Sequence, residues 1–322
     1  MENTVKLCFF SFGIMEQGGG FENYVIETAV GLKQYYPATD ITILTASPRL
    51  TERLQSLLTL YHWRKHDVAS IYRESRQAVE SKLGGRVQYR HFDRITDLRR
   101  MLQDYDVIYT KNEILELGLI KRIGYAKLPP VIIGVHTSIY YPVAPSASAR
   151  LHNLLYTGRL YQWLINGAQS IKVNTRDDQE FVQCKLKFPV VQVVHHAFVV
   201  TDRPGPQRHD GLNLLFVGRL SEQKGVDILL AVTDMLAQNG VLARLRLKIA
   251  GSGDAAITQK VLELADRYEN VTYLGHVANA EIGGLYDWCD VTVIPSRYET
   301  LNKVAIETGM ACRIALASDI PG

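Results

Sequence analysis

Residues 214–225 read LLFVGRLSEQKG, an apolar run that ends at Gly218 and is followed by a polar loop. An amphipathic run over 225–238 comes next, so the pattern predicts a strand, a glycine turn and a helix. The loop carries Arg219 and Lys224. Ligands of open parallel sheets bind beyond the carboxyl ends of the strands, where two cations would neutralise a diphosphate leaving group. Two solvated loop residues are the alternative interpretation.

The same alternation of apolar runs and helical patterns extends along the whole chain and predicts an α/β protein with parallel sheets covered on both faces. A stretch with two prolines and two glycines, residues 199–211, interrupts it. We therefore predict two doubly wound Rossmann-like domains, 1–198 and 212–322, joined by this linker and facing a central cleft. The expected strands are 5–10, 41–45, 107–109, 131–135, 190–194, 214–217, 245–250, 271–274, 291–294 and 314–317, and the expected helices are 21–36, 225–238, 257–268 and 303–310.

Two further glycine loops follow predicted strands. The first contains Gly19 and Gly20 and opens a helix, where the backbone approaches an anion closely, unless it is only a flexible turn. The second, IAGSGDAA over 249–256, includes Gly251 and matches the dinucleotide fingerprint G-x-G-x-x-A. That match is weak, because it follows the second strand after the linker, and the acidic residues at the expected distance lie in a polar helical segment.

A fourth loop, PSRYETLNKVAIE over 295–307, places Glu299 and Glu307 on either side of a predicted helix N-terminus. Free backbone N–H groups at such a terminus bind phosphate. Carboxylates bind sugar hydroxyls well because each oxygen accepts hydrogen bonds. Two exposed helix carboxylates are the alternative.

Taken in order, these loops resemble the retaining glycosyltransferases of family 4, the glycosyl transferases group 1, whose fold is called GT-B. The resemblance is strongest over 214–322 and looser before it, where Gly-Gly-Gly-Phe-Glu over 18–22 and Gly-Val-His over 134–136 carry it. It implies a nucleoside diphosphate sugar as donor and a glycan or lipid-linked acceptor, in cell-surface polysaccharide or glycoconjugate synthesis.

The resemblance also implies roles for individual residues. Arg219 and Lys224 would bind the diphosphate, Glu307 the ribose and Glu299 the sugar, while His136 would line the reaction centre. The other donor-binding positions that it implies are Gly19, Gly20, Gly218, Gly251, His276, Val277, Thr300, Leu301 and Asn302.

The implied chemistry is hexosyl transfer with retention and without a covalent nucleophile, a metal ion or another cofactor. Three departures from the family pattern stand out: Asn302 replaces a usual glycine, Cys-Arg-Ile over 312–314 replaces Gly-x-Pro, and the sequence stops at 318–322, where relatives are expected to continue. A non-catalytic sugar-nucleotide-binding protein and a GT-B-fold sugar-nucleotide epimerase are the alternative functions.

The location expected from the sequence is cytoplasmic, because the four cysteines stand singly and no signal-peptide pattern precedes the first strand. Residues 49–100 hold twelve Lys/Arg against six Asp/Glu, which predicts peripheral contact with anionic membrane. A solvated basic face is the alternative, and no nucleic-acid motif accompanies the charge. The interleaved aromatic residues are Tyr61, Trp63, Tyr72, Tyr89 and Phe92.

The second predicted domain is much shorter than the first. A doubly wound sheet normally continues beyond a strand such as 314–317 with another helix and strand. We therefore expect a C-terminally truncated chain that is poorly soluble or oligomeric and weakly active.

Overall fold

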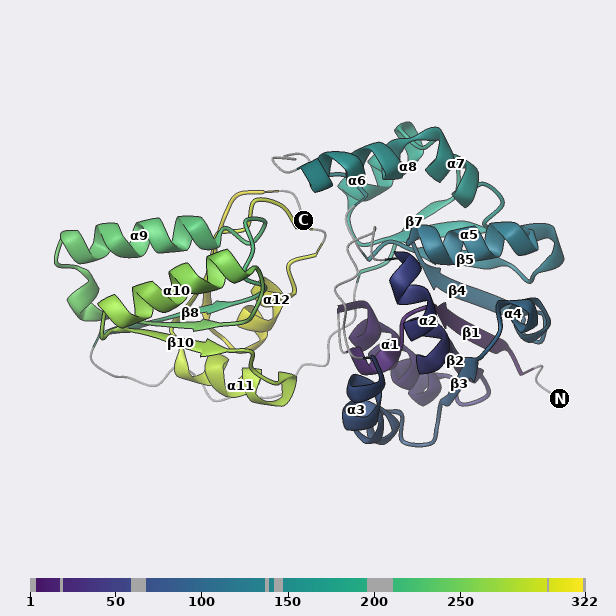
Figure 1. Ribbon diagram of the computed structural model, residues 1–322, viewed down its shortest axis with the longest axis horizontal. Helices are drawn as coiled ribbons and strands as arrows, with labels where there is room; N and C mark the ends of the chain where they lie inside the picture. The colour runs from purple at the N-terminus through teal and green to yellow at the C-terminus, as the bar shows by residue number, and fades with distance from the viewer. Residues whose placement is uncertain are drawn as a thin grey trace. The chain divides into compact units, whose positions relative to one another are not determined.

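The computed structural model describes residues 4–17, 20–58, 68–136, 139–141, 147–195, 211–299 and 301–320. The chain divides into two compact units, residues 1–197 and 198–322 (Figure 1). Each unit contains one parallel sheet with helices packed against it. Most of the linker predicted over 199–211 lies outside the described residues.

The sheet of the first unit has seven parallel strands in the order β3-β2-β1-β4-β5-β6-β7. The chain runs outward from β1 to β3 and returns to β4 on the other side of β1, so the carboxyl ends of β1 and β4 mark a topological switch point. The strands are β1 (Lys6–Ser11), β2 (Asp40–Ala46), β3 (Gln88–Phe92), β4 (Val107–Lys111), β5 (Val131–Gly134), β6 (Ser170–Val173) and β7 (Val191–Val193).

Helices cover both faces of this sheet. Alternate residues of β1 enter different clusters: Phe10 packs with Leu98 of α4, and Phe9 packs with Val25 of α1. This alternation is what a strand buried on both faces requires. The helices are α1 (Gly20–Tyr35), α2 (Pro48–Leu58), α3 (Val68–Leu83), α4 (Ile95–Leu102), α5 (Ile114–Ile123), α6 (Ala147–Thr157), α7 (Arg159–Ile165) and α8 (Arg176–Cys184), with 3-10 turns at η1 (Met15–Gln17) and η2 (Tyr125–Lys127).

The second unit repeats the plan with five parallel strands in the order β10-β9-β8-β11-β12, and its switch point lies between β8 and β11. Its strands are β8 (Leu212–Val217), β9 (Leu245–Ala250), β10 (Val271–Gly275), β11 (Val291–Ile294) and β12 (Ile314–Ala317). Its helices are α9 (Val226–Gln238), α10 (Ala255–Arg267), α11 (Asn279–Trp288) and α12 (Lys303–Met310), with the 3-10 turn η3 (Leu242–Arg244). Ile314 and Leu316 of the edge strand β12 are exposed.

The predicted α/β class with two parallel sheets is confirmed. Two strands, β3 and β6, were not predicted. β3 is an edge strand with alternating exposure and several polar residues, so it carries no apolar run. β6 is buried but contains Lys172, which interrupts its run. Within the described residues, every helix is too short or too polar to cross a bilayer.

Candidate functional site

Glycines bring the loops of the second unit into backbone contact at the carboxyl edge of its sheet. Gly225 has a φ of +66°, and a Cβ there would overlap the carbonyl oxygen of Pro295, which follows β11. Gly251 has a φ of +142°, and a Cβ there would overlap the carbonyl oxygen of Gly218, which follows β8. Only glycine fits these positions, because of both the backbone conformation and the close approach. The loops after β8, β9 and β11 are thereby packed into one surface.

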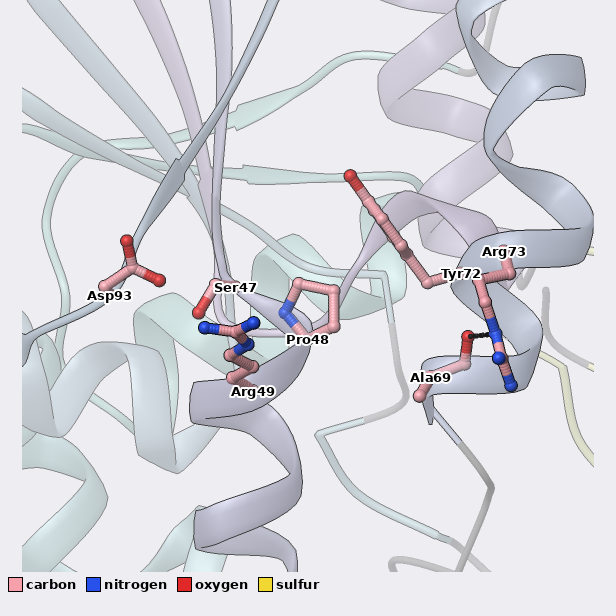
Figure 2. Close-up of a pocket in the computed structure, with 7 residues that line it drawn as sticks. All are labelled: Ser47, Pro48, Arg49, Ala69, Tyr72, Arg73 and Asp93. Carbon is pink, nitrogen blue, oxygen red and sulfur yellow. Dashed lines mark hydrogen bonds between the residues drawn. The ribbon is translucent and has the colours of Figure 1, made fainter.

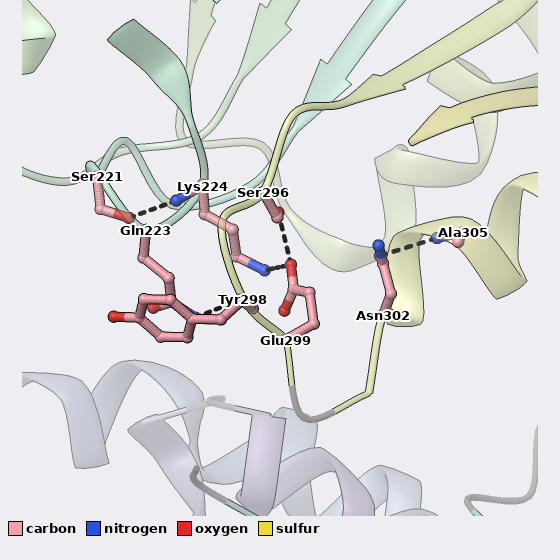
Figure 3. Close-up of polar contacts among 8 residues, drawn as sticks. All are labelled: Ser221, Gln223, Lys224, Ser296, Tyr298, Glu299, Asn302 and Ala305. Carbon is pink, nitrogen blue, oxygen red and sulfur yellow. Dashed lines mark hydrogen bonds and ion pairs between the residues drawn. The ribbon is translucent and has the colours of Figure 1, made fainter. Parts of the chain in front are cut away.

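Lys224 and Glu299 meet across this surface (Figure 3). The Lys224 Nζ lies 2.6 Å from the Glu299 Oε1, and the Ser296 hydroxyl donates to the same oxygen at 2.7 Å. The Glu299 side chain is 7% exposed and the Lys224 side chain 25%. The Glu299 Oε2 has no partner among the described residues. The pair therefore presents spare ammonium protons and one spare carboxylate oxygen.

A second ion pair ties the same two loops together. The Arg297 guanidinium binds both oxygens of Asp227 at 2.7 and 2.6 Å, and the Arg297 N–H donates to the Gln223 carbonyl at 2.8 Å. The Arg297 hydrogen bonds hold the pKa of the Asp227 carboxyl below its usual value. Because Asp227 opens α9, this bidentate contact fixes the loop of Glu299 to the loop of Lys224.

The helix that follows the Glu299 loop begins where the sequence predicted. The Asn302 side chain caps α12 by accepting from the Ala305 N–H at 3.1 Å, so it serves the helix terminus. One turn further along, the Glu307 Oε2 accepts from the Tyr286 hydroxyl at 2.9 Å. Leu301 is half-buried in the same loop, and Thr300 lies outside the described residues.

Arg219 and His276 are exposed, and Val277 is half-buried. The Arg219 guanidinium has no hydrogen bond or ion pair within the described part of the chain. The Gly275 carbonyl accepts from the Gly251 N–H at 2.7 Å, so the loop of His276 lies beside the Gly251 loop. Across the described ranges, no three His, Cys, Asp or Glu side chains gather as metal ligands.

In the first unit, His136 sits in an aromatic cluster just beyond β5. Its Nε2 lies 2.7 Å from the Tyr109 hydroxyl. The rings of Phe21 and Tyr24, both on α1, lie 5.0 and 4.3 Å from the imidazole. Gly20 begins α1 immediately before Phe21, so this glycine lies near the predicted histidine. Gly19 lies outside the described residues.

Lys172 of β6 joins this cluster and was not singled out from the sequence. It is 5% exposed. Its ammonium donates to the Asn174 side chain and lies 4.9 Å from the centre of the Tyr24 ring. Burial lowers the pKa of Lys172 to about 8. In the sequence, a lysine inside a strand looks like the end of an apolar run. The place of Lys172 in this cluster is therefore visible only from its neighbours in the folded structure.

A separate pocket of about 520 Å³ lies at the carboxyl ends of β2 and β3. Figure 2 shows that its lining comes from the start of α2, from α3 and from the turn after β3. The residues that line it are Ser47, Pro48, Arg49, Ala69, Tyr72, Arg73 and Asp93.

The comparisons with known proteins agree with this geometry. Residues 211–322 match the family described as Glycosyl transferases group 1. This part of the chain is a glycosyl transferases group 1 domain. The chain is 37% identical over 112 residues to an uncharacterized glycosyltransferase of Methanocaldococcus jannaschii, a match that covers 34% of this chain and 27% of the relative. It is 29% identical over 141 residues to a glycogen synthase of Mesorhizobium japonicum, covering 42% and 28%. The matched segments thus span about a quarter of these curated relatives.

The solved structures extend the likeness to both units. The structure of Anabaena HepE in complex with UDP and glucose matches with a TM-score of 0.68 and 16% identity, over 99% of this chain and 82% of that one. This likeness, together with the two parallel sheets, confirms the predicted GT-B fold.

Within the group 1 domain, the departure over 312–314 has a structural explanation. The buried Arg313 guanidinium donates to the carbonyls of Tyr286, Asp287 and Ala311. It thereby provides hydrogen-bond donors for two carbonyls in the last turn of α11. Cys312 has a φ of +55°, a conformation that favours glycine. The replacement therefore keeps the backbone turn and adds a buried cap.

Several residues that shape the site of the group 1 domain were quoted in the sequence motifs but given no role. Ser296 and Arg297 stand inside the fourth motif. Ser296 contacts Glu299 within its own loop, whereas the contact of Arg297 with Asp227 needs two loops from opposite sides of the switch point. The sequence did not indicate a role for Tyr286, because its hydroxyl contacts Glu307 from a different helix, α11.

Proposed function

We propose that this chain is a retaining glycosyltransferase that moves a hexosyl group from a nucleoside diphosphate sugar to an acceptor hydroxyl. The observation that carries the proposal is the Lys224–Glu299 pair, with Arg219 exposed on the same loop at the carboxyl edge of a group 1 domain. HepE, which has the same fold, was solved with UDP and glucose. A diphosphate and a sugar are the two groups that such cations and a carboxylate recognise.

Lys224 and Glu299 would divide the donor between them. The ammonium keeps two protons free of Glu299, and these with Arg219 would bind the diphosphate. The Glu299 Oε2 would accept from sugar hydroxyls. The pairing holds Lys224 in place before the donor arrives, which reduces the reorganisation needed as charge develops on the leaving group.

The remaining donor contacts follow from the neighbouring loops. Glu307 would bind the ribose, held by the Tyr286 hydroxyl. The backbone of Leu301 and Asn302 would approach the sugar, and His276 and Val277 would contact the base. Gly218 and Gly251 support this surface, because their loops pack without side chains between them.

In the proposed reaction, the bond between the anomeric carbon and the donor phosphate oxygen breaks. The acceptor oxygen bonds to the same carbon from the same face, and its proton passes to the departing diphosphate. Configuration is thereby retained without a covalent enzyme intermediate. Arg219 and Lys224 would neutralise the leaving group, so we propose a metal-independent reaction.

The first unit would receive the acceptor. His136 would line the reaction centre, and Gly20 begins the helix that holds the rings around it. The pocket near Arg49 and Arg73 offers two exposed cations to a charged part of a glycan or lipid-linked acceptor. This would suit synthesis of a cell-surface polysaccharide or glycoconjugate by an enzyme on the cytoplasmic side.

Calorimetry with UDP and UDP-glucose, followed by GDP- and ADP-sugars, tests the donor assignment. A donor at a hundredfold excess over its dissociation constant should also stabilise the chain by about 2.7 kcal/mol. Glu307→Ala should weaken the free nucleoside diphosphate and the donor alike. Glu299→Ala should weaken the donor and spare the free nucleoside diphosphate.

Glu263→Ala is the matched control, because Glu263 is an exposed carboxylate on α10 whose partner is Gln259 of the same helix. It should change neither affinity. Binding of no nucleotide sugar would contradict the proposal. Donor binding without transfer to any acceptor would identify a non-catalytic binder, and an interconverted nucleotide sugar would identify an epimerase.

A further inference from the structure

Helices α6 and α7 follow one another in the first unit (Figure 1). Both expose large apolar side chains. Leu151 and Leu154 are 49% and 70% exposed and lie three residues apart on α6. Leu160 and Trp163 are 50% and 56% exposed and lie three residues apart on α7. Residues three apart share one side of a helix. These four residues are called the α6–α7 surface below.

The sequence segment that contains the α6–α7 surface carries only positive charges, although the Glu113 carboxylate, which precedes it, accepts a hydrogen bond from Tyr156 of α6. Residues 117–176 contain no Asp or Glu and seven Lys or Arg. Arg159 begins α7 and is exposed. The Lys121 ammonium of α5 lies 5.0 Å from the centre of the Trp163 ring, so a cation borders the apolar residues directly.

We propose that the α6–α7 surface docks onto an anionic lipid bilayer. Leucine and tryptophan side chains enter the boundary between headgroups and acyl chains, while surrounding cations attract anionic headgroups. The excess of Lys and Arg in this stretch, with Lys121 beside the Trp163 ring, favours a negatively charged lipid surface. The inference deepens the proposed function, because an enzyme so docked would meet a lipid-linked acceptor at the bilayer.

The segment 49–100, predicted from the sequence to contact membrane, shows no comparable apolar surface in the part whose side chains the structure describes. Among its described side chains, those of 49–53 and 68–100, no large apolar side chain stands out as exposed. Phe92 is 1% exposed in the core. The Tyr89 hydroxyl donates to Glu16, and the Tyr72 hydroxyl contacts His91. Tyr61 and Trp63 lie outside the described residues.

Helix α9 provides a matched control within the same chain. Val232 and Met235 are 44% and 60% exposed and also lie three residues apart. Asp227 and Asp234 stand on the same helix, so this apolar stripe has carboxylates beside it. Anionic lipid should repel it, although its apolar exposure is similar.

Co-sedimentation of the full chain, without any nucleotide, tests the proposal. The probes are vesicles of phosphatidylcholine mixed with phosphatidylglycerol, and vesicles of phosphatidylcholine alone. We expect binding to the anionic vesicles that weakens as salt is added. The double variant Leu154→Gln/Trp163→Gln should bind at least about tenfold more weakly, and Val232→Gln/Met235→Gln within about twofold of the parent chain. Arg159→Glu should weaken binding at low salt.

A fluorescence measurement identifies the residue that enters the lipid. Anionic vesicles should shift the emission to shorter wavelength, and Trp163→Phe should abolish the shift. Equal binding to both vesicle types, equal losses in the two double variants, or no binding at low salt would overturn the proposal. Loss of self-association in Leu154→Gln/Trp163→Gln, with no vesicle binding by the parent, would instead make this an interface between copies. Vesicle binding requires no donor. The membrane proposal can therefore fail while the donor assignment holds, and the donor assignment can fail while the membrane proposal holds.

Discussion

The two units hold their candidate ligand-binding groups in different surroundings. In the group 1 domain, Lys224 and Glu299 form an ion pair between two loops that glycines bring into backbone contact. In the first unit, His136 and Lys172 both lie close to the Tyr24 ring. One arrangement pairs opposite charges near solvent, and the other buries a cation against an aromatic face without an ion-pair partner within the described residues.

This difference predicts which substitutions would disturb the candidate site of each unit. The group 1 domain depends on backbone geometry, because a side chain at Gly225 would separate the two charged loops. The first unit depends on desolvation, because Lys172 is charged at neutral pH in a site that lowers its pKa. Substitutions can therefore test the two arrangements separately.

The largest effect is expected for Gly225→Ala. The alanine would need a left-handed conformation, and its Cβ would overlap the Pro295 carbonyl oxygen. We expect a loss of about 4 kcal/mol in the stability of the group 1 domain, measured by urea unfolding. Gly240→Ala, at the other end of α9, has a similar φ of +69° but no neighbour within 4 Å, so it should cost only about 1 kcal/mol. Equal losses would remove the Pro295 contact from the explanation.

Lys172→Met should change the pH dependence of stability. The folded-state pKa of Lys172 is about 8 and its usual value is 10.5, so between these pH values the unfolded chain binds more protons than the folded chain. The stability of the parent should therefore rise, relative to the variant, by about 3 kcal/mol as the pH rises through this window. Unfolding curves of both proteins between pH 7 and 10, spaced by about one unit, measure it. Lys260→Met, at an exposed lysine of α10, is the control and should show no such trend. A constant difference for Lys172→Met would contradict the buried cation.

Arg219→Ala and Lys224→Ala should each lower kcat at least about a hundredfold, or ~2.7 kcal/mol, if the two cations stabilise the leaving group. The effect should be smaller on the binding of the free nucleoside diphosphate. Steady-state kinetics with the donor found by calorimetry would measure this. Near-normal turnover in both variants would refute the role of these cations, and Lys260→Ala controls for the loss of an exposed positive charge.

The smallest effect is expected for Cys312→Gly. Cys312 has a φ of +55°, and relief of this strain should raise stability by about 1 kcal/mol or slightly less. Cys184→Gly makes the same chemical change at the other exposed cysteine, in the last residue of α8, and should lower stability by a similar amount. Thermal unfolding of both variants provides the test. A loss in both would show that the Cys312 side chain makes a contact worth more than the strain.

Many elements and the candidate donor loops could be predicted from sequence, because they depend on local patterns. The start of α12 at Lys303 follows from polar residues before an amphipathic run, and Asn302 caps it. β6 could not be predicted in the same way, because the charge of Lys172 hides a buried strand. The ion pair between Arg297 and Asp227 was also beyond the sequence, because the two residues lie 70 positions apart.

The sequence by itself determined the alternation of strands and helices, the glycine turns and the identity of the charged residues beyond the strands. These follow from periodicity and from the backbone freedom of glycine, which act over a few residues. Only the tertiary structure decided which charges meet. Glu299 meets Lys224 because parallel strands bring distant loops to one edge of a sheet. Lys172 meets Tyr24 because the fold brings helix α1 close to strand β6. The free energy of such contacts depends on burial and distance, and neither is a property of sequence order.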